Sequence, residues 1–205
     1  RENIETASLL VSYVGEGERI AHIRLLKFSG DTPTEWEASV REILQKREVT
    51  SVILDLRNNP GGYLQAAVDI ASEFIETGST VVIQESAVGG KSEFKAEKLG
   101  RMQDMQVVVL INQGSASASE ILAGALRDVD GTPLVGQTSF GKGTIQEPRQ
   151  INGGSALHIT TARWLTPSGY WVDEGGLKPD VEVANDPNTE DDEQLQEAIR
   201  ILETT

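Results

Sequence analysis

The sequence contains no cysteine among its 205 residues, so disulfides, cysteine nucleophiles and zinc–thiolate sites are excluded. Its two histidines, His22 and His158, are too few for a three-histidine metal site. The sequence has no apolar run of about eighteen residues, so no segment is expected to cross a membrane. These absences narrow the candidate chemistry before any motif is considered.

Basic residues are also scarce: the sequence has 18 Lys and Arg but 32 Asp and Glu, which gives a formal net charge of −14. This surplus of negative charge argues against nucleic-acid phosphate as the main partner. Acidic residues without any basic ones occupy the segment 185–197, which we interpret as a solvated linker leading into a helix over residues 193–202. We therefore expect one domain over residues 1–184, followed by an acidic linker and helix over residues 185–205.

The middle of the chain repeats one pattern of elements about 55 residues apart, which is typical of stacked βαβ units. In each repeat a short apolar strand leads into a turn rich in small and polar residues, and a helix with an apolar face follows. The first repeat covers strand 51–56, turn 57–62 and helix 64–74, and the second covers strand 106–111, turn 112–115, helix 117–128 and strand 133–135.

The flanking segments predict more β structure around this α/β centre. Alternating apolar residues predict a hairpin over residues 9–24, and Thr32 and Glu35 predict a capping box at the start of a helix. Further strands are expected at residues 80–83, 89–95, 144–148, 156–162 and 170–172. The sequence thus indicates a single α/β domain that turns to β structure in its C-terminal third.

The second glycine-rich turn places three serines, Ser115, Ser117 and Ser119, where a helix begins. A helix N-terminus presents free N–H groups, which suit an anion or the oxyanion of a tetrahedral intermediate. Serine is also a preferred N-cap residue, so helix capping is the alternative interpretation of this segment.

A serine nucleophile needs a base. Both histidines lie in strand-like segments far from the serine turn, so a Ser-His-Asp triad has little support in the sequence. Lys142 is the stronger candidate, because it lies between two glycines at a spacing that can return the chain to the helix start. A lysine acts as a base only when neutral, which burial favours. The alternative is a flexible loop with a solvated lysine.

The same loop offers a third interpretation, a nucleotide-binding protein, since residues 136–142 match the first part of a phosphate-binding loop. That motif continues with Ser or Thr and opens a helix, whereas Gly143 stands at this position and the segment after it looks extended.

Together these segments resemble the carboxyl-terminal processing, or tail-specific, serine proteases. The resemblance covers about residues 1–183 and rests on motifs in family order: residues 54–62, 114–121, 138–143, 157–163, 166–169 and 176–180. It implies an α/β fold of the crotonase/Clp-protease type with stacked ββα units and a β-rich C-terminal part.

The resemblance also implies roles for individual residues. Ser117 would be the nucleophile of a Ser-Lys dyad, Lys142 its general base, and Gln146 a support for the lysine. The oxyanion hole would use the N–H of Ala118 and of a glycine in the first turn, either Gly62, which we favour, or its neighbour Gly61. Candidates for residues around the dyad are Asp128 and Glu120, for which surface and first-turn helix carboxylates are the alternative interpretation. No metal or cofactor is implied.

The implied reaction is cleavage of unstructured proteins near their C-terminus through an acyl-enzyme. The implied setting is the bacterial periplasm or cell envelope, or the thylakoid lumen, with a possible homo-oligomer. Family members normally carry a peptide-binding PDZ module, which is not recognisable before the core here, so we expect weak or ungated activity from this chain. A non-catalytic binding protein on the same core, as in retinoid-binding repeats, is the competing function.

Overall fold

The computed structural model describes residues 7–150, 156–185 and 191–204, and its centre is a six-stranded sheet. The first strand pairs antiparallel with the second, and the remaining neighbours pair in parallel. In spatial order the strands are β1 (Leu9–Val14), β2 (Ile20–Leu25), β3 (Ser51–Asp55), β6 (Gln106–Ile111), β7 (Leu134–Gly136) and β10 (Val181–Glu182).

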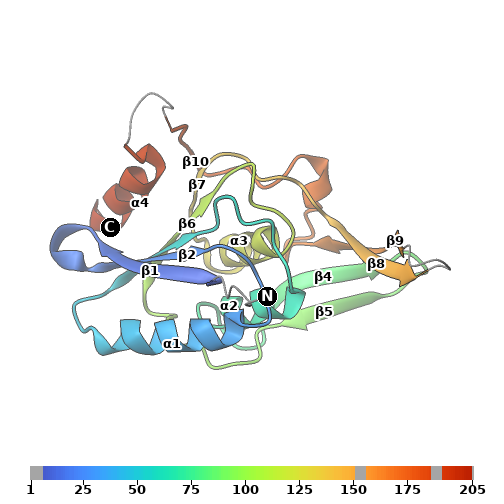
Figure 1. The fold of residues 1–205 in the computed structure, drawn as a ribbon, viewed down its shortest axis with the longest axis horizontal. Helices are drawn as coiled ribbons and strands as arrows, with labels where there is room; N and C mark the ends of the chain where they lie inside the picture. Colours follow the sequence, from blue (N-terminus) through green and yellow to red (C-terminus); the bar gives the residue numbers. More distant parts are fainter. Residues whose placement is uncertain (1–6, 151–155, 186–190, 205) are drawn as a thin grey trace, which may run out of the picture.

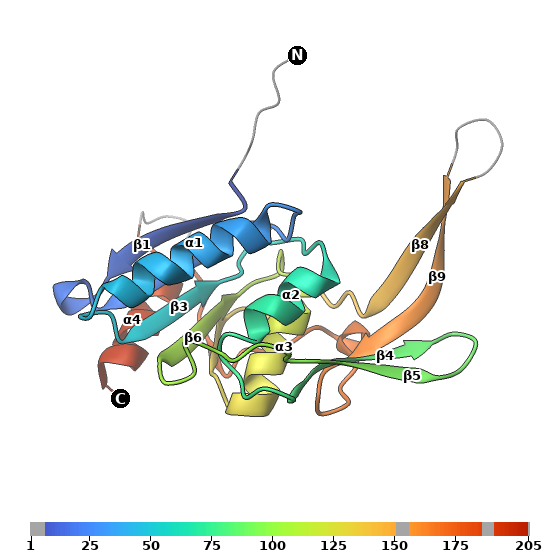
Figure 2. The same ribbon diagram turned by 90° about the horizontal axis from the view of Figure 1, so that it is seen from below.

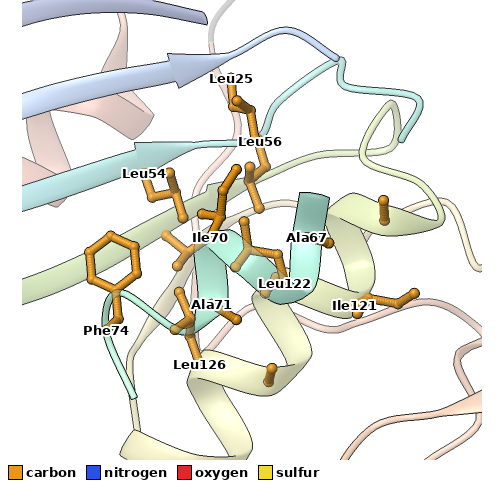
Figure 3. Close-up of a cluster of buried hydrophobic side chains, with 14 of the residues drawn as sticks. Leu25, Leu54, Leu56, Ala67, Ile70, Ala71, Phe74, Ile121, Leu122 and Leu126 are labelled. Atoms are coloured by element: carbon orange, nitrogen blue, oxygen red, sulfur yellow. The ribbon is translucent and has the colours of Figure 1, made fainter. Parts of the chain in front are cut away.

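Helices cover both faces of this sheet, so its middle strands are apolar on both sides. On β3, Val52 and Leu54 face one hydrophobic cluster while Ile53, between them, faces the other. The larger cluster includes helices α1 (Thr32–Gln45), α2 (Leu64–Ala71) and α3 (Ala118–Asp130), and Figure 3 shows α2 and α3 packed beside Leu54 and Leu56. The smaller cluster lies under α4 (Glu193–Thr204), on the opposite side of the sheet from α1 in Figure 1.

The central helix α3 positions the candidate site. Its residues from Ala118 to Leu126 are all buried, as expected of a helix packed on every side. Small residues allow the close approach, and a side chain at Gly124 would come within 2.9 Å of Thr166. This helix is therefore closely packed against its surroundings along most of its length.

A second, antiparallel sheet extends to one side of the molecule as two hairpins (Figure 2). Its strands, in spatial order, are β5 (Lys91–Lys95), β4 (Thr80–Ser86), β9 (Ala156–Leu165) and β8 (Thr144–Gln150). The base of this sheet lies beside the start of α3, because Trp164 on β9 and Ile145 on β8 line the same pocket as Ser117.

The predicted α/β architecture, its parallel crossovers and the hairpin over residues 9–24 are confirmed, but two local predictions, a strand and a capping box, are wrong. Residues 170–172 form no strand and lead into a 3-10 helix, η2 (Val172–Glu174), while β10 was not predicted. The turn before β2 contains another 3-10 helix, η1 (Glu16–Glu18). The predicted capping box at α1 does not form, because Asp31 is the N-cap and the Glu35 carboxylate binds the N–H and hydroxyl of Ser8.

The acidic C-terminal segment is anchored to the sheet through Asp192. Its carboxylate accepts hydrogen bonds from Arg57 at 2.7 and 2.8 Å, and Arg57 also binds the fully buried Asp55. Burial alone would raise the pKa of Asp55, but hydrogen bonds from Arg57 and His22 outweigh burial and lower the pKa to about 2. The division of the chain at residue 184 remains a prediction. Within the described residues, every helix is too short or too polar to span a bilayer.

Candidate active site

The three serines of the second turn differ in their surroundings. Ser115 is fully buried and donates its hydroxyl to the Leu56 carbonyl at 2.8 Å. Ser119 is fully buried and donates its hydroxyl to the Asn59 carbonyl at 3.0 Å. Ser117 is only half-buried and lines a pocket of about 420 Å³. Two of the serines therefore join this turn to the preceding one, and Ser117 is the one that faces the open space.

Ser117 occupies the N-cap position of α3 with φ 56° and ψ −115°, a backbone conformation that residues other than glycine rarely adopt. Its N–H donates to Glu120 Oε2 at 2.9 Å. The capping and nucleophile interpretations thus concern the same residue. Ala118 follows as the first residue of the helix, and its N–H makes no hydrogen bond to another described residue.

The first glycine turn, residues 57–62, packs directly against the serine turn. A Cβ at Gly61 would lie 2.6 Å from the Ala116 carbonyl, so only glycine fits at this position. The Gly61 N–H is occupied by Asn59 Oδ1 at 2.9 Å. Gly62 lines the pocket, and its N–H has no partner among the described residues.

The lysine loop, residues 139–143, is fixed on both sides. The Phe140 N–H donates to the Ser115 carbonyl at 2.9 Å, and the Ser139 hydroxyl donates to Glu120 Oε1 at 2.6 Å. The indole N–H of Trp164 donates to the Lys142 carbonyl at 2.9 Å. The chain returns to the helix start, as the spacing predicted, and these hydrogen bonds join the loop to its surroundings.

The Glu120 carboxylate joins the serine turn to the lysine loop. It is fully buried, and besides Ser117 and Ser139 it accepts the N–H of Gly141 at 2.7 Å and the N–H of Lys142 at 2.9 Å. The four donors share its two oxygens, which is the full capacity of an ionised carboxylate. Glu120 was a candidate from the sequence, and the structure brings it into contact with both loops.

The side chain of Lys142 is exposed, in contrast to the burial that the sequence argument required. It lines the same pocket as Ser117 and Gln146, although Ser117 Oγ and Lys142 Nζ, both in the described part of the chain, form no hydrogen bond. The rest of the pocket wall is mainly apolar with a few polar groups: Gly62, Leu64, Gln84, Ala118, Ile121, Thr144, Ile145 and Trp164.

Asp128 lies at the other end of α3, ten residues and about 15 Å beyond its first residue, Ala118. Its carboxylate accepts the N–H of Ser168 at 3.0 Å. Burial opposes ionisation, but hydrogen bonds from Ser168 and Thr166 outweigh it and lower the pKa of Asp128. Asp128 therefore holds the turn at residues 166–169 and does not line the pocket.

The histidines and the phosphate-loop motif do not contribute to this pocket. The Nε2–H of His22 donates to Asp55 Oδ2, 3.1 Å away on the central sheet, and His22 is not a pocket residue. The side chain of His158 lies outside the described parts of the structure. The Gly136–Lys142 loop runs into strand β8 rather than a helix, as the sequence indicated. Among the described residues no group of three or more acidic or histidine side chains could hold a metal ion.

Comparison with known proteins identifies the family of this chain. Residues 19–183 match the model of peptidase family S41, and the chain belongs to that family. The resemblance to carboxyl-terminal processing serine proteases, stated from the motifs, is confirmed.

Two bacterial relatives are similar over most of the chain. The carboxy-terminal processing protease CtpA of Bacillus subtilis (strain 168) is 40% identical over 164 residues, which are 80% of this chain and 35% of that protein. A probable CtpA-like serine protease of Staphylococcus aureus (strain N315) is 39% identical over 184 residues, which are 89% of this chain and 36% of that protein. The chain thus spans about a third of the length of these curated relatives.

Solved structures share the fold. The photosystem II D1 C-terminal processing protease superposes with a TM-score of 0.81 at 30% identity, covering 98% of this chain and 54% of that one. The tricorn protease superposes with a TM-score of 0.61 at 18% identity over 90% of this chain and 18% of that one, which is a likeness of fold alone.

Sequence reasoning missed several residues that build the site. Asn59 and Ser139 were parts of motifs and Trp164 lay between two motifs, but no role was assigned to any of the three. A role for Asn59 could have been predicted from its place among the turn-forming residues 57–62, because Asn side chains in turns often form hydrogen bonds with nearby backbone groups. For Ser139 and Trp164 the partners are distant in sequence, and no local pattern indicates them.

Proposed function

We propose that this chain is the catalytic core of a serine endopeptidase that cleaves unstructured protein chains near their C-terminus. The observation that carries the proposal is the convergence of Ser117, Lys142 and Gly62 on one pocket, in a chain that belongs to peptidase family S41. Two relatives are named for carboxy-terminal processing, which supports this choice of substrate.

In the proposed mechanism neutral Lys142 removes the hydroxyl proton of Ser117, and the serine oxygen attacks the peptide carbonyl. The N–H groups of Gly62 and Ala118 hold the resulting oxyanion. The leaving amine takes a proton from the lysine, and water then hydrolyses the acyl-enzyme. Gln146 lines the same pocket and is proposed to orient the lysine. A substrate chain lying over the pocket removes water from the exposed Lys142, which favours the neutral amine.

The geometry supports Gly62 rather than Gly61 as the oxyanion donor, because the Gly61 N–H already binds Asn59. It also supports Ser117 over Ser115 and Ser119, whose hydroxyls are buried and bound to carbonyls. We further propose that the protein acts outside the cytoplasm, in a periplasm, cell envelope or thylakoid lumen.

The test is incubation with an unfolded model protein, with fragments identified by mass spectrometry. Wild type is expected to cleave, and Ser117→Ala and Lys142→Ala to lose about 10³-fold or more of the rate. Ser92→Ala, at an exposed serine on β5, is the matched control and retains the wild-type rate. Equal behaviour of wild type and Ser117→Ala would favour a non-catalytic binding protein on the same core.

A further inference from the structure

Asn59 is fully buried between the three segments that meet at the candidate site. Its Nδ2 donates to the Leu25 carbonyl at the end of β2, at 2.7 Å, and its Oδ1 accepts the Gly61 N–H at 2.9 Å. Its own backbone carbonyl accepts the Ala116 N–H and the Ser119 hydroxyl, both at 3.0 Å. One residue therefore links the C-terminal end of β2, the glycine turn and the serine turn.

A contact of Phe28 indicates the direction of the neighbouring Gly62 N–H. The Gly61 carbonyl accepts the Phe28 N–H at 3.0 Å. In a trans peptide the C=O and N–H point in opposite directions, so the Gly62 N–H points away from Phe28. Gly62 lines the pocket that contains Ser117, and no described residue uses its N–H, which leaves this N–H available as an oxyanion donor.

We propose that Asn59 is a positioning residue that sets the orientation of the Gly61–Gly62 peptide as an oxyanion donor. The inference rests on the proposed peptidase function and deepens it. The position needs a short, neutral side chain with one donor and one acceptor, because Leu25 offers a carbonyl and Gly61 offers an N–H. Neither an aliphatic side chain nor an ionised carboxylate meets both needs.

The experiment compares Asn59→Asp with wild type on a fluorogenic unstructured peptide, measuring kcat and KM separately. At neutral pH the introduced carboxylate accepts from Gly61 but cannot donate to Leu25. We expect kcat to fall by about 10- to 100-fold, part of the loss seen when an oxyanion donor is removed, with KM unchanged within about twofold. Asn58→Asp is the matched control, because Asn58 is exposed and its side chain binds Asn112 instead.

A pH series separates this role from a merely structural one. A protonated carboxyl group can donate to Leu25 and accept from Gly61 as the amide does, and burial raises the pKa of an introduced acid. The ratio of Asn59→Asp to wild-type kcat is therefore expected to rise several-fold from mildly alkaline to mildly acidic pH. Taking the ratio removes the titration of the rest of the site, and the control ratio is expected to stay flat.

Three outcomes are decisive. If the kcat of Asn59→Asp equals that of wild type, or if the ratio of the two does not change with pH, the positioning role is overturned. The proposed function still holds in that case, provided that cleavage by wild type depends on Ser117. Absence of Ser117-dependent cleavage by wild type overturns both. If circular dichroism shows that Asn59→Asp does not fold, Ser119→Ala is the second variant, because it removes one hydrogen bond from the Asn59 carbonyl. A kcat loss of about 2- to 10-fold at unchanged KM in Ser119→Ala supports the positioning role. Unchanged kcat in Ser119→Ala overturns it.

Discussion

Glu120 shows how much of the candidate site depends on one side chain. Its carboxylate receives the N–H groups of Ser117, Gly141 and Lys142 and the hydroxyl of Ser139 while fully buried. Hydrogen bonds to a buried charged group are among the stronger ones in proteins. The relative position of the serine turn and the lysine loop is therefore set by this carboxylate together with the hydrogen bond from the Phe140 N–H to the Ser115 carbonyl, and not by a hydrogen bond between Ser117 and Lys142.

Replacing Glu120 by glutamine tests this arrangement. In Glu120→Gln one acceptor oxygen becomes an NH₂ group facing donors, which leaves buried N–H groups unpaired and costs about 2 kcal/mol of unfolding free energy or more. We expect kcat/KM to fall by at least about tenfold, because a small displacement of reacting groups is costly. Urea unfolding and peptide cleavage measure the two effects.

Glu35→Gln is the matched control. Glu35 accepts the N–H and hydroxyl of Ser8 in a half-buried place and is not a pocket residue. It is expected to lower stability without a specific loss of kcat/KM. Equal activity losses in the two variants would contradict the role of Glu120.

At the scale of elements, local patterns predicted strands and helices well where apolar periodicity was strong, as in β3, β6 and α3. They failed where tertiary contacts decide, as at residues 170–172, which end in the short helix η2. The acidic C-terminal segment illustrates the same limit. Its helix was predicted, but the ion pair between Arg57 and Asp192 joins residues 135 positions apart, and no local pattern could indicate it.

Helix α4 is expected to depend on that ion pair. Asp192 binds Arg57 through both oxygens and also accepts the Leu195 N–H at 3.0 Å near the helix start. Because the Asp192 side chain is 38% exposed, Asp192→Asn is expected to cost only about 1 kcal/mol of unfolding free energy. Asp191→Asn, at the exposed neighbouring residue, makes the same chemical change and should cost less than about 0.5 kcal/mol. Equal unfolding curves for the two variants would argue against the anchor.

For the whole molecule, the sequence predicted the α/β class and the grouping of its motifs, since turns after parallel strands meet at one sheet edge. It could not predict that Glu120 and Asn59 join those turns, because each contact depends on the packing of α3 against the sheet. It also placed Asp128 near the motif, while the helix carries that residue to its far end.

Stability is expected to fall in acid. The pKa of Asp55 is about 2 in the folded protein and near its ordinary value of 3.8 when unfolded, so the unfolded chain binds more protons between these values. The stabilisation is fully present above about pH 4 and is lost as the pH falls toward about 2, a contribution of roughly 2 kcal/mol. Asp192 and Glu35, whose pKa values are also lowered, act in the same direction.

Urea unfolding across this range, in buffer with enough salt to screen the net charge of −14, measures the effect. A free energy of unfolding that stays constant from about pH 5 to about pH 3 would contradict the acid dependence.

The pocket wall is formed by residues as far apart as Gly62 and Trp164, and the lysine loop also receives a hydrogen bond from the Leu177 N–H on the Ser139 hydroxyl. A chain emerging from the ribosome therefore has no working site until most of it has been made and folded. A fragment that ends before Trp164 is therefore expected to lack the proposed peptidase activity even when it contains both Ser117 and Lys142.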